Sequence, residues 1–256
     1  PIMPFGTSNF VGLAVDVKGS AYLTGATSSR HFPVKNAFQS EMGGGGIDGF
    51  FLKLTPNGKG LVFSSFLGGG SYEYGSLAAV DPSGSFIIVG STASRDFPIS
   101  GGMQKTLRGR TDIFVAKFFA DGRSLAYSTF LGGSGSELPR ALAMDGSGAA
   151  YLTGGTTGRG FPVKNAFQTK VAGGTDAFIT KIAPAGDRII YSTFFGGTST
   201  DEGRALAVDE SGAAYVAGYT TGKIPLRNAL QKTRKGASEG FISKVAPDGK
   251  SLDYST

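Results

Sequence analysis

Short runs of apolar residues alternate with glycine-rich turns along the chain, and the same pattern returns about every 64 residues. The clearest copy, TDAFITKIAPAGDRIIYSTFFGG from Thr175, predicts two β-strands joined by a Pro-x-Gly turn. Equivalent stretches begin at Ile47, Thr111 and Ser238. The period is marked by aspartates at intervals of 65, 64 and 64 residues: Asp16, Asp81, Asp145 and Asp209. A fixed interval of this kind indicates a solenoid, a propeller or an array.

Each copy contains four strand-like runs. The first is short and apolar and ends in an Asp-x-x-Gly turn; these runs are Leu13–Val15, Ala78–Val80, Leu142–Met144 and Leu206–Val208. The second run follows the turn, and a long connection of about twenty residues then leads to the hairpin described above. In that connection the sequence FPVKNAFQ occurs at Phe32 and again at Phe161. We expect its last four residues to form a single helical turn whose aromatic ring packs back on the sheet.

The predicted strands are apolar on both faces, as in FITKI and the adjoining IIYSTFF. Both faces must therefore be covered, and no segment predicts a covering helix, so the neighbouring repeats must cover them. The sequence predicts an all-β fold, a β-propeller of four four-stranded blades in one domain over residues 1–256. The expected blades are 1–67, 68–131, 132–195 and 196–256, either as a closed ring or as part of a larger propeller.

The composition limits the kinds of site that the chain can contain. Apolar residues make up 40% of the chain and 42 of its 256 residues are glycine, which fits a folded protein rich in tight turns. The absence of cysteine excludes disulfides and thiolate metal sites, and the single histidine, His31, excludes a multi-histidine site. We find neither a signal peptide nor an apolar run of membrane-spanning length, so no membrane insertion is expected. Because the chain begins at Pro1 and stops within a repeat at Thr256, we expect it to be a processed or excised piece of a longer protein.

The combined pattern resembles a known family. Phe-x-x-Lys, Pro-x-Gly, Tyr-Ser-Thr-Phe-Leu-Gly-Gly, Ala-x-Asp-x-x-Gly-x-x-Tyr, Phe-Pro and Ala-Phe-Gln follow one another as in the SBBP family of bacterial β-propeller repeats. The resemblance covers almost the whole chain in four copies. It implies a β-propeller on a secreted or cell-surface bacterial protein, with no enzyme activity and no cofactor. The family name presumes seven blades, whereas this sequence shows four.

Basic residues concentrate in the four long connections, which contain 14 lysines and arginines against two acids. Loops between second and third strands leave one face of a propeller, so we expect that face to be basic and to attract polyanions. The candidate ligand-binding residues are Arg95, Lys105, Arg108, Arg110, Lys164, Lys170, Arg227, Lys232, Arg234 and Lys235. The alternative is that these residues only keep exposed loops soluble. The basic tracts lack aromatic residues, which disfavours nucleic acid as the partner.

A second candidate set consists of one lysine in each third strand: Lys53, Lys117, Lys181 and Lys244. A buried ammonium group needs a partner. We expect each lysine to pair at a blade interface, with the aspartate of the Asp-x-x-Gly turn or with the acid that opens the third strand. These opening acids are Asp48, Asp112, Asp176 and Glu239. The alternative is an axial ring of ammonium groups that captures an anion.

Catalytic and metal sites find little support in the sequence. The four Asp-x-x-Gly turns are ordinary turn chemistry, although a ring of such carboxylates is an alternative cation site. Asp201 and Glu202 are expected to lie in a solvated glycine-rich loop. We therefore predict a non-enzymatic binding or structural module that contacts a protein or an acidic polysaccharide. The alternatives are a propeller lyase or lactonase with an axial metal, and a pure spacer in an extracellular array; self-association to complete a ring is also left open.

Overall fold

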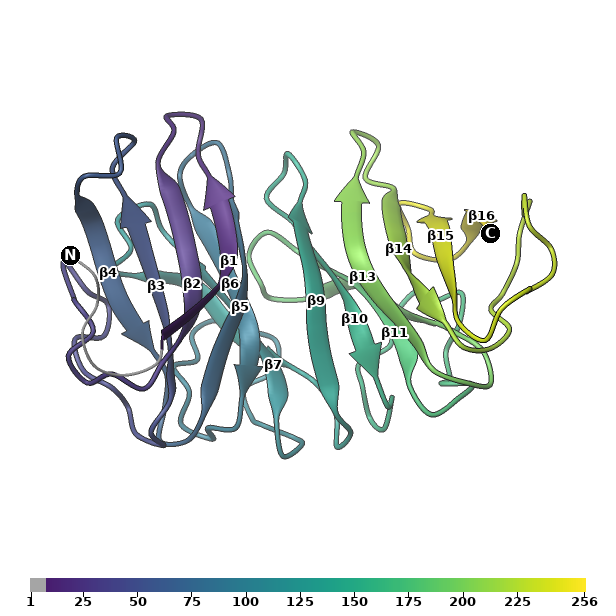
Figure 1. Cartoon of the computed structure of the whole chain (residues 1–256), viewed down its shortest axis with the longest axis horizontal. Coiled ribbons are helices and arrows are strands. Elements are labelled where there is room, and N and C mark those ends of the chain that lie inside the picture. Colours follow the sequence, from purple (N-terminus) through teal and green to yellow (C-terminus); the bar gives the residue numbers. More distant parts are fainter. Residues whose placement is uncertain (1–7) are drawn as a thin grey trace. The chain divides into compact units, whose positions relative to one another are not determined.

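The computed structural model describes residues 8–256, which form sixteen β-strands (Figure 1). The strands belong to two compact units, one up to Leu131 and the other from Gly132 to Thr256. Each unit contains two four-stranded antiparallel sheets, and in each sheet the strands follow one another in chain order. The prediction of an all-β fold built from four four-stranded, propeller-like sheets is confirmed. No helix long and apolar enough to cross a membrane occurs in residues 8–256.

The first unit contains two sheets that lie against each other. One consists of β1 (Ser8–Val15), β2 (Ala21–Thr27), β3 (Asp48–Leu54) and β4 (Leu61–Leu67). The other consists of β5 (Glu73–Val80), β6 (Phe86–Thr92), β7 (Asp112–Phe118) and β8 (Leu125–Leu131). Strand β5 packs against β1, β2 and β3, so the second sheet covers one face of the first.

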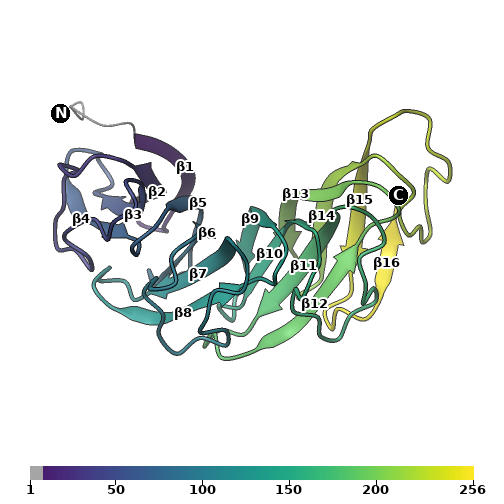
Figure 2. The same ribbon diagram turned by 90° about the horizontal axis from the view of Figure 1, so that it is seen from below.

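The second unit repeats this arrangement, with two neighbouring sheets (Figure 2). One consists of β9 (Glu137–Met144), β10 (Ala150–Thr156), β11 (Asp176–Ile182) and β12 (Ile189–Phe195). The other consists of β13 (Asp201–Val208), β14 (Ala214–Thr220), β15 (Glu239–Val245) and β16 (Leu252–Ser255). Strand β13 packs against β9, β10 and β11.

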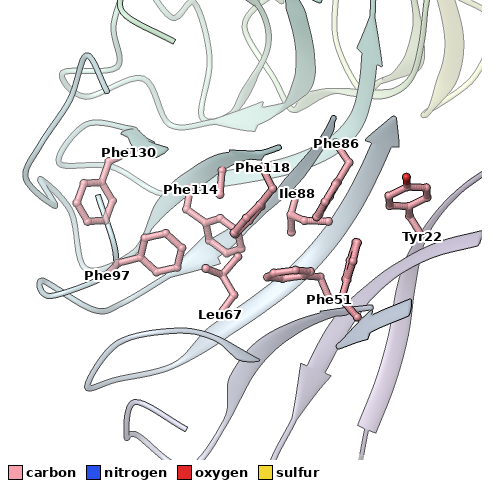
Figure 3. Packing of buried hydrophobic residues seen from close by; sticks show 11 residues of the cluster. Tyr22, Phe51, Leu67, Phe86, Ile88, Phe97, Phe114, Phe118 and Phe130 are labelled. Carbon is pink, nitrogen blue, oxygen red and sulfur yellow. The ribbon is translucent and has the colours of Figure 1, made fainter. Parts of the chain in front are cut away.

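Aromatic side chains fill the space between the two sheets of the first unit (Figure 3). Phe86 stacks on Phe63 and on Phe118, with 5.3 Å between ring centroids in both pairs. Tyr22 and Phe51 of the first sheet contact the same Phe86 ring. Residues of both sheets thus share one core, which explains why their strands are apolar on both faces.

The first strands are longer than predicted. They begin five residues before the apolar run and contain a β-bulge, an extra residue in the ladder to the second strand. The bulge lies at an equivalent position in every sheet: Val11, Ser76, Arg140 and Arg204. The prediction of a solvated loop at Asp201 and Glu202 is wrong, because both residues belong to β13 and both are buried.

The expected helical turn after Phe-Pro is also absent. Instead the chain runs beside the fourth strand, with backbone hydrogen bonds from Lys164 N to Ser192 O (3.0 Å) and from Ser192 N to Lys164 O (2.8 Å). The next residue, Asn165, has a φ of 47° and donates from Nδ2 to Ile190 O at 2.8 Å. A left-handed residue at this point ends any helical turn, and the asparagine side chain ties the connection to β12 instead.

Candidate functional site

All ten candidate ligand-binding residues of the long connections have exposed side chains. Arg95, Lys105, Arg108 and Arg110 belong to the first unit. The other six lie in the second unit, on the connections from β10 to β11 and from β14 to β15. These two connections contain no acidic residue. The positive charge of the second unit's connections is therefore not balanced within them.

The second unit has two adjoining hollows along the connection from β10 to β11, which share Thr169, Lys170 and Val171 and are together called the groove. Its first part, of about 330 Å³, is lined by Phe161, Phe194 and Val171, together with Arg159 and Lys170. A second part, of about 490 Å³, shares Lys170 and Val171 and extends to Pro225 of the connection from β14 to β15. The groove thus combines apolar walls with two exposed cations.

Backbone hydrogen bonds hold the walls of this groove. Arg159 O accepts from Ser134 N at 2.7 Å, and Gly158 N donates to Thr156 Oγ1 at 2.9 Å. On the other wall, Gln168 N donates to Thr193 Oγ1 at 3.1 Å. The backbones that carry Arg159 and Lys170 are therefore fixed by the sheet edge, while their charged ends reach solvent. In the first repeat the position of Lys170 is occupied by Glu41, so this cation is not a requirement of the fold.

The four third-strand lysines each pair with the Asp-x-x-Gly aspartate of their own sheet. The Nζ to Oδ2 distances are 3.0 Å for Lys53–Asp16, 3.8 Å for Lys117–Asp81, 3.4 Å for Lys181–Asp145 and 3.4 Å for Lys244–Asp209. The same aspartates also accept hydrogen bonds from the backbone of their turns. One carboxylate therefore closes the turn and neutralises a largely buried ammonium group.

These bonds favour the ionised form of the carboxylate. The hydrogen bond from Ser20 N lowers the pKa of Asp16 to about 2, with help from Lys53. Hydrogen bonds from Ser211 Oγ and from the backbone likewise lower the pKa of Asp209. In three sheets a tyrosine joins the pair, and the Tyr22 hydroxyl, 2.6 Å from Lys53 Nζ, also donates to Gly84 O of the next sheet's turn. The cluster thus links neighbouring sheets.

Within residues 8–256 no ion pair joins these lysines to the acids that open the third strands, so that alternative is wrong. In the second unit Asp176 accepts from Ala172 N, Gly173 N and Gln168 Nε2. Its carboxylate faces that of Asp201 across Gly196: a Cβ on Gly196 would lie 2.9 Å from Asp176 Oδ1 and 2.8 Å from Asp201 Oδ2. The two acids therefore converge on one glycine at the boundary between two sheets.

The first unit repeats this buried carboxyl pair. Around Gly68, Asp48 faces Glu73, and both residues are fully buried. Burial, with Glu73 nearby, raises the pKa of Asp48 to about 6, and burial also raises the pKa of Glu73. Among the residues that the structure describes, no group of three or more acids and histidines has an arrangement that could hold a metal ion.

Sequence reasoning missed one cluster in the second unit, made of Arg140, Glu202, Arg204 and Tyr219. Glu202 accepts from Arg140 Nε on the neighbouring sheet and, at 2.9 Å, from Arg204 Nη2. Tyr219 donates from its hydroxyl to Glu202 at 3.2 Å, and its ring lies 5.3 Å from the Arg204 guanidinium. The sequence did contain a signal for this cluster, because its arginines depart from the repeat. The bulge position holds arginine in the last two copies but valine and serine in the first two.

Comparison with known proteins identifies the repeat. Residues 190–225 match the SBBP family model, described as a beta-propeller repeat. This stretch is similar to an SBBP repeat. It runs from β12 through β13 and β14 to Pro225, so the SBBP match includes Glu202, Arg204 and Tyr219 and one wall residue of the groove. No curated protein matches the sequence.

Among solved structures, the chain is similar to a gluconolactonase, XC5397 from Xanthomonas campestris. The two share 11% identity with a TM-score of 0.43. The match covers 96% of this chain and 61% of the gluconolactonase chain, so the present chain spans about three fifths of that protein's length. A likeness this distant carries no information about activity.

Proposed function

We propose that this chain is a non-enzymatic binding module of a bacterial surface or secreted protein, and that it binds an acidic polysaccharide through its long connections. The observation that carries the proposal is the groove of the second unit. Its apolar walls suit the C–H faces of sugar rings, and Arg159 and Lys170 suit the carboxylates or sulfates that those sugars carry. No acid on the two neighbouring connections competes for these cations.

The connection from β14 to β15 carries further exposed bases. Lys232, Arg234 and Lys235 lie within four residues of one another and all are exposed. Two hydrogen bonds hold this segment: the Arg234 guanidinium donates from Nη1 to Thr221 O, and Gly236 N donates to Glu239 Oε1 at 2.8 Å. A polymer that follows the groove can thus gain long-range attraction from several cations in addition to the contacts in the groove.

The test is binding to polygalacturonate, a sulfated glycan and a neutral glucan, at low and at physiological salt. We expect saturable binding to an acidic glycan that survives physiological salt, and a loss of about tenfold in the variant Arg159→Gln/Lys170→Gln. The matched control is Arg188→Gln/Lys250→Gln, which removes the same charge from two hairpin turns of the same unit. Equal losses in both variants, or equal binding to the neutral glucan, would reject a dedicated groove.

A further inference from the structure

The Arg140–Glu202–Arg204–Tyr219 cluster, here called the arginine clamp, is built differently from the repeated ion pairs. The side chain of Glu202 is only 8% exposed, whereas those of Arg140 and Arg204 are 36% and 48% exposed. A buried carboxylate thus holds two arginines whose outer parts reach solvent. Two guanidinium groups and one carboxylate leave a net charge of +1.

The arginines retain hydrogen-bond donors for a ligand. Arg140 binds Glu202 through Nε, and Arg204 binds it through Nη2. Within residues 8–256 the two Nη nitrogens of Arg140, and Nε and Nη1 of Arg204, have no hydrogen-bond partner. Because each guanidinium is a planar fork that matches a carboxylate, the remaining N–H groups suit a second, external carboxylate.

The local sequence explains why the clamp forms only in this unit. The β-bulges at Arg140 and Arg204 place an extra side chain on each first strand. Gly155 of β10 lacks a side chain and leaves room for Glu202, whose Cγ lies 3.2 Å from the position of a Cβ on that glycine. In the other sheets, the residues equivalent to Gly155 are alanine, serine and tyrosine. The fold does not need the clamp, because the other first strands form without it.

The clamp lies at the strand ends from which the long connections leave. Glu202 is the second residue of β13, and Tyr219 is the last but one of β14. Directly beyond them, Thr221 N donates to Thr200 O at 2.9 Å, and Thr200 N donates to Thr221 Oγ1 at 3.0 Å. A sugar chain bound to the long connections can therefore reach this edge of the unit.

We propose that the arginine clamp is a second anion site, which binds the carboxylate of a uronic acid residue. The choice of a sugar acid rests on the proposed function, whereas the anion site itself rests on the clamp geometry alone. The guanidinium forks bind the carboxylate, Glu202 holds them in position, and Tyr219 supports Arg204 by a cation–π contact.

The test uses a ligand too short to need the groove, methyl β-D-glucuronide, with methyl β-D-glucoside as its neutral counterpart. Titration of the whole chain by NMR should give saturable binding of the glucuronide only. Arg140→Gln and Arg204→Gln should each weaken binding by about tenfold or more, because each removes charge-assisted hydrogen bonds. Arg204→Lys keeps the charge but not the fork, so it should also weaken binding.

Arg188→Gln is the matched control, since it removes one positive charge from an exposed turn of the same unit. It should leave glucuronide binding unchanged. The proposal is overturned if the glucoside binds equally well, if Arg188→Gln loses as much affinity, if Arg204→Gln binds the glucuronide as well as the unchanged chain, or if no saturable binding is seen.

Arg140 also joins two sheets, and Arg140→Gln can therefore fail to fold. In that case Arg204→Gln tests the proposal, because Arg204 contacts Glu202 within one sheet. Glucuronide binding without polymer binding would reject the groove and keep the clamp, and the reverse result would reject only the clamp.

Discussion

At the scale of single residues, the buried carboxyl pair at Asp48 and Glu73 predicts an unusual dependence of stability on pH. The pKa of Asp48 is about 6 in the folded chain, against 3.8 for an ordinary aspartate. Between these values the folded state binds a proton that the unfolded state has lost, so the free energy of unfolding falls as the pH rises through this range. Burial raises the pKa of Glu73 and of Asp176 in the same direction.

Thermal unfolding from pH 4 to pH 7 should therefore show the melting temperature decreasing, and Asp48→Asn should reduce the decrease. Below this range the sign reverses, because the lowered pKa of Asp16 gives stability that is lost as that carboxylate is protonated. Asp187→Asn, on an exposed turn, is the control and should leave the slope unchanged. A slope that Asp48→Asn does not alter would contradict the assignment.

The ion pair between Lys181 and Asp145 gives a second prediction at this scale. The side chains are 13% and 16% exposed, so removing the lysine leaves a poorly solvated carboxylate. Lys181→Met should destabilise the chain by about 1–3 kcal/mol, measured by urea unfolding. Arg188→Met, at the exposed pair with Asp187, should cost less than about 0.5 kcal/mol. A double-mutant cycle with Asp145→Asn isolates the pair, and additive effects would show that it contributes nothing.

These residues also show what sequence alone could predict. The repeat pattern placed Lys181 on a predicted strand and Asp145 in a predicted turn, but every copy contains a second recurring acid, which is Asp176 in this copy. Choosing between them needed the register that sets Lys181 beside Tyr151. The start of β13 was missed because Asp201, Glu202 and Gly203 lack the apolar alternation of a half-buried strand. The start of β13 packs against carboxylates, a glycine and arginines, and a hydropathy pattern does not reveal such contacts.

At the scale of elements, the long connections depend on one left-handed residue. Asn36, Asn165 and Asn228 have φ values of 46°, 47° and 48°, and the second repeat has Gly101 there with 63°. That glycine was a sequence signal against the predicted helical turn. Asn165→Ala should cost about 1–2 kcal/mol, because alanine is strained at this φ and loses the bond to Ile190 O. Asn165→Gly relieves the strain and should cost less; in urea unfolding, an alanine variant as stable as the glycine variant would contradict this account.

At the scale of the whole molecule, the residues that recur in every copy explain the fold. The charged residues that do not recur are the candidates for a binding function. Lys53 and its three counterparts recur because every sheet needs the same turn and the same neutral interface. Lys170, Arg140 and Arg204 do not recur in all copies, and the fold gives no reason for their charge. Binding should therefore depend more on the second unit than on the first, although both units carry exposed bases.

Two charge-reversal variants test whether binding depends more on the second unit than on the first. Arg108→Glu/Arg110→Glu changes the first unit, and Arg234→Glu/Lys235→Glu changes the second by the same charge. If long-range attraction alone drives polyanion binding, both variants weaken it equally and physiological salt abolishes it. If the groove and the clamp bind the glycan, the second variant lowers the affinity several-fold more than the first, because its reversed charges repel the chain beside the site. Affinity measurements at two salt concentrations distinguish these outcomes, and equal losses would show that the bases act only through the net charge of +6.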